Sequence, residues 1–227
     1  MSEFIDDFLD EFGAPDFESG PRATIDEALP ISLLQIHEKF GAASWQGGRF
    51  KIIDPKPYQN VVDKWAQELP VQYRNGLVPY CLSGFGDLWV WRQGVGCAFK
   101  YLPIFHALVL DERFESETHS MDSQCFEIEG ELFSWMPDED SQEEKDFESA
   151  RAALGVLSID QIYAPKLAIP LGGNFELESL QVTSAPEYLE MVTELEPPRV
   201  MTTDDLARIA FGADGPEALK AAVKNVC

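Results

Sequence analysis

One stretch of the chain is rich in carboxylates, which are side chains able to bind metal ions or to catalyse proton transfer. Residues 111–148 contain 15 acidic residues and only two basic ones, Arg113 and Lys145. A pair such as Asp138 and Asp140 could bind a metal ion or act as general acid and base, but catalysis needs a preorganised pocket that raises a carboxyl pKa. A run of consecutive exposed acids offers no such pocket, so the stretch favours binding over catalysis.

The other side chains that commonly carry out chemistry are scattered along the sequence. The histidines show no HxxxH or HExxH spacing and the cysteines form no CxxC pair, so neither a metal site, a redox motif nor a cofactor is predicted. Gly94 and Gly96 lack the third glycine of a dinucleotide-binding loop, which favours hairpin turns. We expect structural histidines and free, mostly buried thiols. These residues are His37, His106, His119, Cys81, Cys97, Cys125 and Cys227.

The charge of the whole chain limits the partners that it can bind. The 227 residues include 40 acidic and 17 basic side chains, a formal net charge of −23. Such a surface repels phosphate and anionic lipid but accelerates association with a basic protein. Solubility alone would also explain the acidity. No apolar run approaches the roughly 20 residues of a membrane span, and the acidic N-terminus differs from a signal peptide, so we expect a cytoplasmic protein.

The first third of the chain has the pattern of helices with one strand. Apolar residues at helical spacing predict an amphipathic helix over 4–12, ended by Gly13, and a second helix within 25–40, ended by Gly41. Residues 50–53 predict a short strand, and the turn at Asp54-Pro55 leads into a helix through Trp65.

Residues 78–110 have the pattern of a sheet. Short apolar segments separated by glycine or proline predict neighbouring strands. These segments are 80–82, 88–91, 98–102 and 107–110. Trp89 and Trp91 fall on one face of their strand, since strand side chains alternate, and core packing is favoured over a ligand platform.

The second half of the chain returns to mixed patterns, and each of its segments gives a prediction. Residues 126–135 predict a strand pair or a strand with a turn, 147–157 an amphipathic helix, and Ser158 with Gln161 a capping-box pattern for a short turn. Residues 167–171 predict a buried strand, and 177–195 a strand or helix that leads into a closing helix. After Pro197-Pro198, residues 202–205 are able to cap a short helix, and Gly215-Pro216 begins another.

An ordered series of motifs accompanies these elements. The chain carries EFG at 11–13, FGDLWVW at 85–91 and IPLGG at 169–173. The series resembles the two-part immunity proteins that bacteria make against type VI secretion DNase effectors. Residues from FLDEFG at 8–13 to FGDLWVW look like the GAD-like domain of that family, and residues from 147 to 195 are similar to its C-terminal domain. The positions matching the C-terminal pattern are Leu154, Gly155, Leu157, Asp160, Tyr163, Leu167, Ala168, Leu171, Gly172 and Gly173.

The resemblance implies an antitoxin that binds a cognate DNase effector and catalyses nothing. A DNase needs a positively charged groove for phosphates, so an acidic surface is able to occlude its active site and to steer association. Trp135 is the preferred aromatic anchor, with a core role as the open alternative. The candidate toxin-binding residues are Glu127, Glu129, Glu131, Trp135, Asp138, Glu139, Asp140, Glu143 and Glu144.

The expected architecture is α+β, with a central, mostly antiparallel sheet, helices packed on one side and two parts that are able to share one core. We divide the chain into a GAD-like domain (1–110), a C-terminal immunity domain (111–197) and a helical tail (198–227). The alternatives are an orphan protein-binding or regulatory module without a toxin partner, an enzyme, and a DNA-binding regulator, which the net charge disfavours. Direct nucleic acid or membrane binding is not expected.

Overall fold

An eight-stranded sheet organises the chain. The computed structural model describes residues 3–21, 29–110, 128–130, 132–134 and 141–212. The strands are β1 (Phe17–Glu18), β2 (Ala43–Trp45), β3 (Phe50–Ile52), β4 (Leu77–Ser83), β5 (Leu88–Arg92), β6 (Gly96–Leu102), β7 (Ala107–Leu110), β8 (Gln161–Pro165), β9 (Leu180–Ser184) and β10 (Arg199–Thr202). The helices are α1 (Glu3–Phe12), α2 (Ile31–Phe40), α3 (Gln59–Ala66), α5 (Gln142–Leu154), α6 (Ala185–Leu195) and α7 (Thr203–Phe211).

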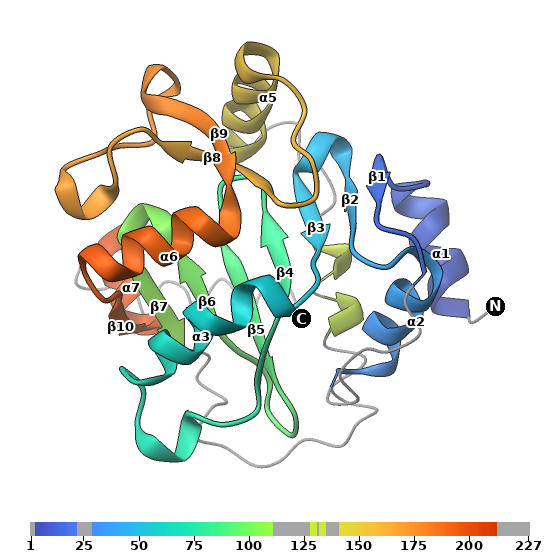
Figure 1. Cartoon of the computed structure of the whole chain (residues 1–227), viewed down its shortest axis with the longest axis horizontal. Coiled ribbons are helices and arrows are strands. Elements are labelled where there is room, and N and C mark those ends of the chain that lie inside the picture. Colours follow the sequence, from blue (N-terminus) through green and yellow to red (C-terminus); the bar gives the residue numbers. More distant parts are fainter. Residues whose placement is uncertain (1–2, 22–28, 111–127, 131, 135–140, 213–227) are drawn as a thin grey trace.

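The strand order confirms the predicted α+β class. The main sheet runs β1-β2-β3-β4-β5-β6-β7-β10, and β8 and β9 form a second, two-stranded sheet (Figure 1). Neighbouring strands of the main sheet are antiparallel, except for β7 and β10, which are parallel. The four strands predicted within residues 78–110 are β4 to β7.

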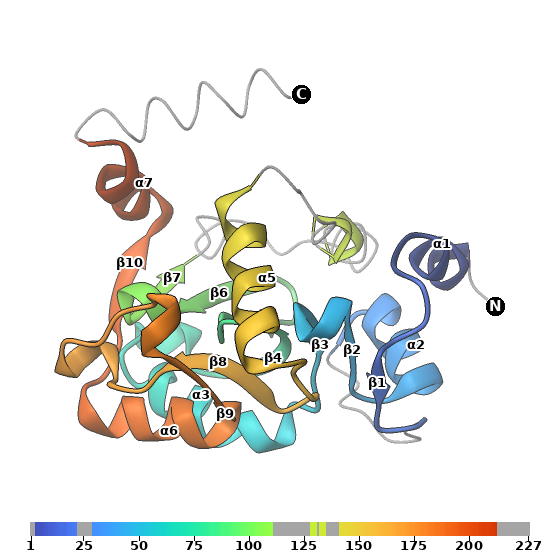
Figure 2. The same ribbon diagram turned by 90° about the horizontal axis from the view of Figure 1, so that it is seen from above.

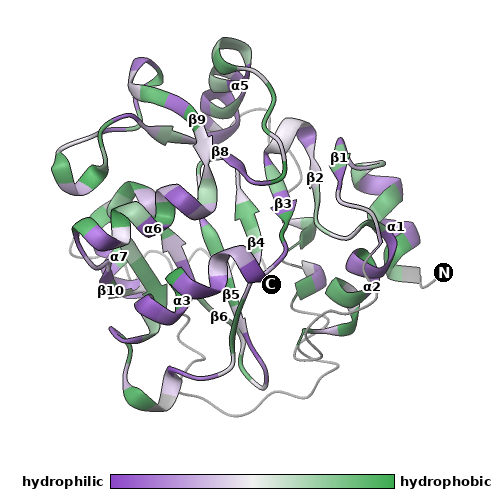
Figure 3. Cartoon of the chain, viewed as in Figure 1, coloured by the Kyte–Doolittle hydropathy of each residue, from purple (hydrophilic) through white to green (hydrophobic). Residues whose placement is uncertain are grey.

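Helices cover both faces of the main sheet, which differs from the one-sided arrangement expected from the sequence (Figure 2). The reason is the alternation of side chains along β5. Leu88 and Val90 pack in one core with α3 and α6. Trp89 and Trp91 pack in a second core with α1 and α2, so both tryptophans belong to the hydrophobic core, as predicted. In Figure 3 the hydrophobic colour runs along β4 and β5, where both faces are covered.

The two halves of the chain share the first of these cores. Trp65 and Tyr101 from the first half lie in it with Tyr188 and Leu189 from α6. The Trp65 ring stacks on Tyr101 with 4.5 Å between ring centroids. The backbone N–H of Tyr163 in β8 also donates to the carbonyl of Gly84 at 2.8 Å. Folding of each half therefore depends on apolar surface supplied by the other.

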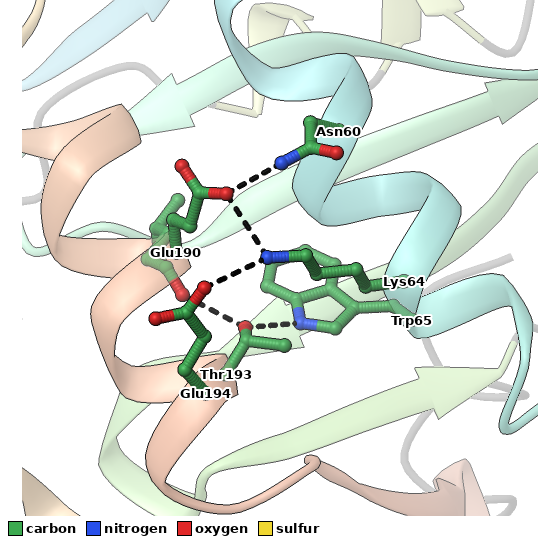
Figure 4. A network of polar contacts seen from close by, with 7 residues as sticks. Asn60, Lys64, Trp65, Glu190, Thr193 and Glu194 are labelled. Carbon is green, nitrogen blue, oxygen red and sulfur yellow. Dashed lines mark hydrogen bonds and ion pairs between the residues drawn. The ribbon is translucent and has the colours of Figure 1, made fainter.

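A polar network closes the outer edge of this core between α3 and α6 (Figure 4). The Trp65 indole Nε1 donates to Thr193 Oγ1 at 2.7 Å. Lys64 Nζ lies 2.9 Å from Glu190 and 3.2 Å from Glu194. These carboxylates accept hydrogen bonds from Lys64 and raise its pKa.

The tail after Pro198 is part of the sheet. β10 lies beside β7 in parallel register, with Met201 opposite Val109. The predicted cap at residues 202–205 is confirmed: Thr202 and Asp205 form a capping box at the start of α7. Backbone and side-chain hydrogen bonds from Thr202 lower the pKa of Asp205. The strand itself was not predicted, because only four residues separate the proline pair from the helix.

Two predictions for the second half are wrong, and one is confirmed. Residues 128–130 and 132–133 are helical where strands were expected, and Ile128 and Leu132 are both buried, four residues apart. The short turn expected from Ser158 to Gln161 is present: the Gln161 N–H donates to the Ser158 carbonyl at 3.2 Å and the Ser158 N–H donates to Gln161 Oε1 at 3.0 Å, after which β8 begins.

The second wrong prediction is the buried strand expected at 167–171. Residues Ile169–Leu171 form a 3-10 turn, and Leu171 is 57% exposed. Pro170 has no N–H for a sheet ladder, and the turn ends at Gly172, whose φ is +91°. A Cβ on Gly173 would lie 1.6 Å from the carbonyl oxygen of Leu167, so this position requires glycine.

Candidate functional site

The structure places three of the nine predicted toxin-binding residues, and it gives them different environments. Glu129 is half-buried and accepts a hydrogen bond from the Ser32 hydroxyl of α2. Glu143 is exposed in the first turn of α5, and Glu144 beside it is buried. The other predictions lie outside the described residues. They are Glu127, Glu131, Trp135, Asp138, Glu139 and Asp140.

Glu144 has a structural role. Its Oε2 lies 2.6 Å from Nε of Arg49, and both side chains are about nine-tenths covered. The pair joins α5 to the segment between β2 and β3. Removing one member of a covered ion pair leaves the other charge without compensation, so Glu144 is tied to the fold and not available to a partner.

A groove beside α5 combines carboxylates with aromatic and aliphatic side chains. It has a volume of about 330 Å³ and runs between α5, the β4–β5 turn, the 3-10 turn Pro103–Phe105 and the segment before residue 177. A second hollow of about 380 Å³ shares Phe85, Asp146 and Phe175 with it. The lining residues of the groove are Phe85, Asp87, Pro103, Ile104, Glu143, Asp146 and Phe175.

The turn between β4 and β5, Phe85-Gly86-Asp87 (the FGD turn), supplies the first carboxylate of the groove and holds it in place. The Ser83 hydroxyl donates to Asp87 Oδ2 at 2.7 Å, and the Asp87 N–H donates back to the Ser83 hydroxyl at 2.9 Å. Burial raises the pKa of Asp87 to about 6, against the lowering effect of the Ser83 hydrogen bond. The Glu143 carboxylate raises it further, whereas Lys100 lowers it. At neutral pH this partly buried carboxyl group is mainly ionised.

Helix α5 supplies the other two carboxylates. Glu143 and Asp146 are three residues apart and therefore lie on one face of the helix. Asp146 Oδ1 accepts a hydrogen bond from the Gln142 amide at 2.7 Å. No lysine or arginine is among the described residues that line the groove or the adjoining hollow. Its negative charge is therefore not neutralised by a cation in its own wall.

Aromatic packing fixes the distance between α5 and the FGD turn. Phe85 meets Phe147 and Phe175 edge to face, with 6.1 and 6.2 Å between ring centroids. Gly84 allows this approach, because a Cβ there would lie 2.4 Å from Cε2 of Phe147. Gly84, directly before the FGD turn, thus has a packing role that sets the shape of the groove.

The described cysteines and His106 have structural settings, and no metal site is formed in the described part of the chain. Within it, no group of three or more His, Cys, Asp or Glu residues is arranged to hold a metal ion. Cys81 and Cys97 are buried thiols that form no disulfide, as predicted. His106 bonds through Nδ1 to the Tyr101 hydroxyl and through Nε2 to the Glu196 carbonyl, a structural setting. Across the described helices, no segment has the length and apolar character of a membrane span.

Sequence reasoning missed Phe85, Asp87, Asp146 and Phe175 as groove residues. A signal for Asp146 was present, since it follows Glu143 at helical spacing, but the helix was expected to begin at Phe147. The meeting of Asp87 with α5 depends on contacts between residues about 60 positions apart, and no local pattern reports such contacts.

The described residues define an α+β protein with a carboxylate-lined groove, and comparisons with known proteins identify its family. Residues 3–103 match the GAD-like domain, and residues 129–196 match the domain described as T6SS immunity protein Tdi1, C-terminal. The chain therefore belongs to the type VI secretion immunity proteins that join these two domains.

Comparison with solved structures supports the architecture. The crystal structure of Atu4351 from Agrobacterium tumefaciens superimposes with a TM-score of 0.71 at 20% sequence identity. The match covers 89% of this chain and 93% of that one. At this identity the likeness concerns the fold alone. No curated protein matches the chain.

Proposed function

We propose that this immunity protein binds a cognate DNase effector and neutralises it by covering the active site. The observation that carries the proposal is the carboxylate-lined groove on a chain of net charge −23. A DNase must hold DNA phosphates in a basic groove, and an acidic surface that occupies this groove competes directly with DNA. The protection is stoichiometric binding and includes no catalytic step.

The proposed contact surface has two parts that adjoin at the start of α5. One is the acidic segment that carries most of the candidates from the sequence, among them Glu127, Glu131 and Asp138 to Asp140, with Trp135 as an aromatic anchor. The other is the groove, which Glu143 reaches from the first turn of α5. Rim charges of this kind accelerate association, and aromatic side chains supply the contact area that slows dissociation.

The proposed setting is the cytoplasm, where an antidote meets a DNase that has entered the cell. The partner is a basic nuclease, and neither DNA nor a membrane is a direct ligand, because the charge of the chain opposes both. Acidic residues on the polar side of α1, such as Asp6 and Asp10, are exposed and add to the same field.

Coexpression with the nuclease encoded by the adjacent gene tests the proposal. The readouts are growth of the host, recovery of a complex and DNA cleavage by the nuclease. We expect the parent chain to restore growth and a variant with four acidic residues made neutral to lose protection. The substitutions are Asp138→Asn, Glu139→Gln, Asp140→Asn and Glu143→Gln, and Glu144 is left intact because it pairs with Arg49.

A matched variant separates the interface from the effect of net charge. It removes four exposed carboxylates elsewhere, through Glu18→Gln, Glu38→Gln, Glu68→Gln and Glu187→Gln. We expect it to protect the cell like the parent chain. Absence of any complex and of any protection by the parent would contradict the proposed function for this nuclease and favour an orphan binding module.

A further inference from the structure

We infer that the groove between α5 and the FGD turn receives an arginine side chain projecting from the toxin, an inference that rests on the proposed function for the identity of the partner. Glu143, Asp146 and Asp87 are the groups that meet the guanidinium, and Phe85 and Phe175 form the aromatic wall against which it packs. Such a contact would make the groove the specificity site of the interface.

The composition of the groove fits this ligand group by group. A guanidinium is planar, carries five N–H donors and binds carboxylates through paired hydrogen bonds. It is also weakly hydrated and stacks on aromatic faces, where a lysine ammonium stays a strongly hydrated point charge. Ile104 and Pro103 offer apolar surface for the methylene stem. Carboxylates alone would suit any cation, whereas the aromatic side chains of Phe85 and Phe175 favour arginine over lysine.

The charge of the groove is preorganised, which lowers the cost of binding. Two hydrogen bonds with Ser83 hold Asp87 in the turn. The Phe85–Phe147 contact, made possible by Gly84, holds α5 against this turn. Burial and the Glu143 carboxylate raise the pKa of Asp87, and Lys100, which does not line the groove, offsets this only in part. An arriving guanidinium would offset the remainder, and no described wall residue does so.

A basic toxin is the occupant that the charge indicates. A nuclease places arginine and lysine where DNA phosphates bind, and these side chains are the exposed cations that an occluding protein must meet. A side chain held in a groove against an aromatic wall contributes to slow dissociation, whereas the surrounding acids act on the encounter rate.

The first experiment tests the groove without the toxin. NMR titration of the full chain with N-acetyl-arginine amide should shift the ring signals of Phe85 and Phe175 and the Ile104 methyl signals. Its neutral isostere, N-acetyl-citrulline amide, should cause no such shifts. The double variant Glu143→Gln/Asp146→Asn should lose the response, and the control Glu38→Gln/Glu68→Gln, with the same charge change, should keep it. Asp87 is left intact because it holds the turn.

The second experiment measures affinity for a catalytically inactive form of the adjacent nuclease. We expect the groove variant to bind about tenfold or more weakly, mainly through faster dissociation, and the control variant to bind within about threefold of the parent. Retained tryptophan fluorescence and unfolding midpoint would show that the groove variant is folded.

The outcomes separate the two proposals. Lack of arginine-specific shifts at the groove, or equal weakening of toxin binding in both variants, would overturn the arginine site, even if the toxin binds the parent tightly. Failure of the parent to bind the nuclease would overturn the proposed function for that partner. The amide titration would still decide whether the groove recognises a guanidinium.

Discussion

Acidic residues close together in the sequence have different roles, because their surroundings differ. Glu143 is exposed at the rim of the groove, whereas Glu144 is covered and paired with Arg49. Asp87, far away in the sequence, has its pKa raised by burial and faces the same groove as Glu143. Composition predicted the acidic character of this region, but whether a carboxylate of α5 faces the groove, like Glu143, or pairs inside the fold, like Glu144, depends on the side of the helix that it occupies.

A buried lysine gives the first prediction at the residue scale. Lys51 lies fully covered in β3, where its Nζ donates to the Gly48 carbonyl at 2.8 Å and to the Ser83 carbonyl at 3.4 Å. Burial lowers its pKa to about 7, although Cys81 and Asp160 act in the opposite direction. Above pH 7 the unfolded chain therefore binds more protons than the folded chain, until the unfolded lysine titrates near pH 10.5.

Stability should consequently rise with pH in this window. Between about pH 7 and about pH 9.5 we expect Lys51 to add about 2 to 3 kcal/mol to the free energy of unfolding. Urea unfolding at both pH values measures this, and Lys51→Met should abolish the rise. Lys56→Met removes the same charge from an exposed position and should leave the rise intact. An unchanged rise in Lys51→Met would show that another group is responsible.

At the scale of elements, the contact of α3 with α6 joins the two domains and yields the next prediction. Thr193→Val keeps the shape of the side chain but leaves the buried Trp65 indole N–H without its acceptor, at a cost of about 1 to 3 kcal/mol. Glu194→Gln, which weakens an exposed ion pair with Lys64, should have a much smaller effect.

A double-mutant cycle makes this test specific. Trp65→Phe removes the donor as well as part of the ring, so the double variant Trp65→Phe/Thr193→Val should lose less stability than the two single changes together. Urea unfolding of the four proteins supplies the coupling free energy. Strict additivity would mean that the hydrogen bond does not contribute to stability.

The elements that the sequence predicted well are those with a strong local pattern. Helix α1 and strands β4 to β7 have clear helical or alternating spacing and clear end signals. Ile128 and Leu132 are four residues apart, which is the spacing of one helix face, but the aromatic residues around them suggested strands. At 167–171, apolar composition suggested burial, although Pro170 and Gly172 favour a turn. The groove combines separate elements and was beyond local patterns altogether.

At the scale of the whole molecule, the main sheet crosses the boundaries that sequence patterns suggested. We divided the chain at residues 110 and 197, and that division stays a prediction. β10, beyond the second boundary, pairs with β7 from before the first. The core around Trp65 and Tyr101 includes Tyr188 and Val192 of α6. The two segments that match separate family models therefore contribute to one shared hydrophobic core.

Shared packing predicts one cooperative unfolding transition for the full chain. Tryptophan fluorescence reports mainly on the first half, which holds four of the five tryptophans (Trp45, Trp65, Trp89 and Trp91), and hydrogen exchange of α6 amides reports on the second. We expect both probes to give the same free energy of unfolding, because exposing α6 also uncovers the face of the sheet on which Trp65 packs.

Truncation provides the matching test of this whole-molecule cooperativity. Residues 1–110 alone would keep most strands of the sheet but lose α6, β8 and β10, which is one of the two partners of β7, so we expect this fragment to lack a cooperative transition. A control that removes only residues 213–227 keeps β10 and every core residue discussed here, and it should unfold like the full chain. Cooperative unfolding of the 1–110 fragment, or separate transitions for the two probes, would establish two independent domains. Toxin binding would then be assignable to one of them, whereas a single transition means that damage to either half also disturbs the groove that both halves build.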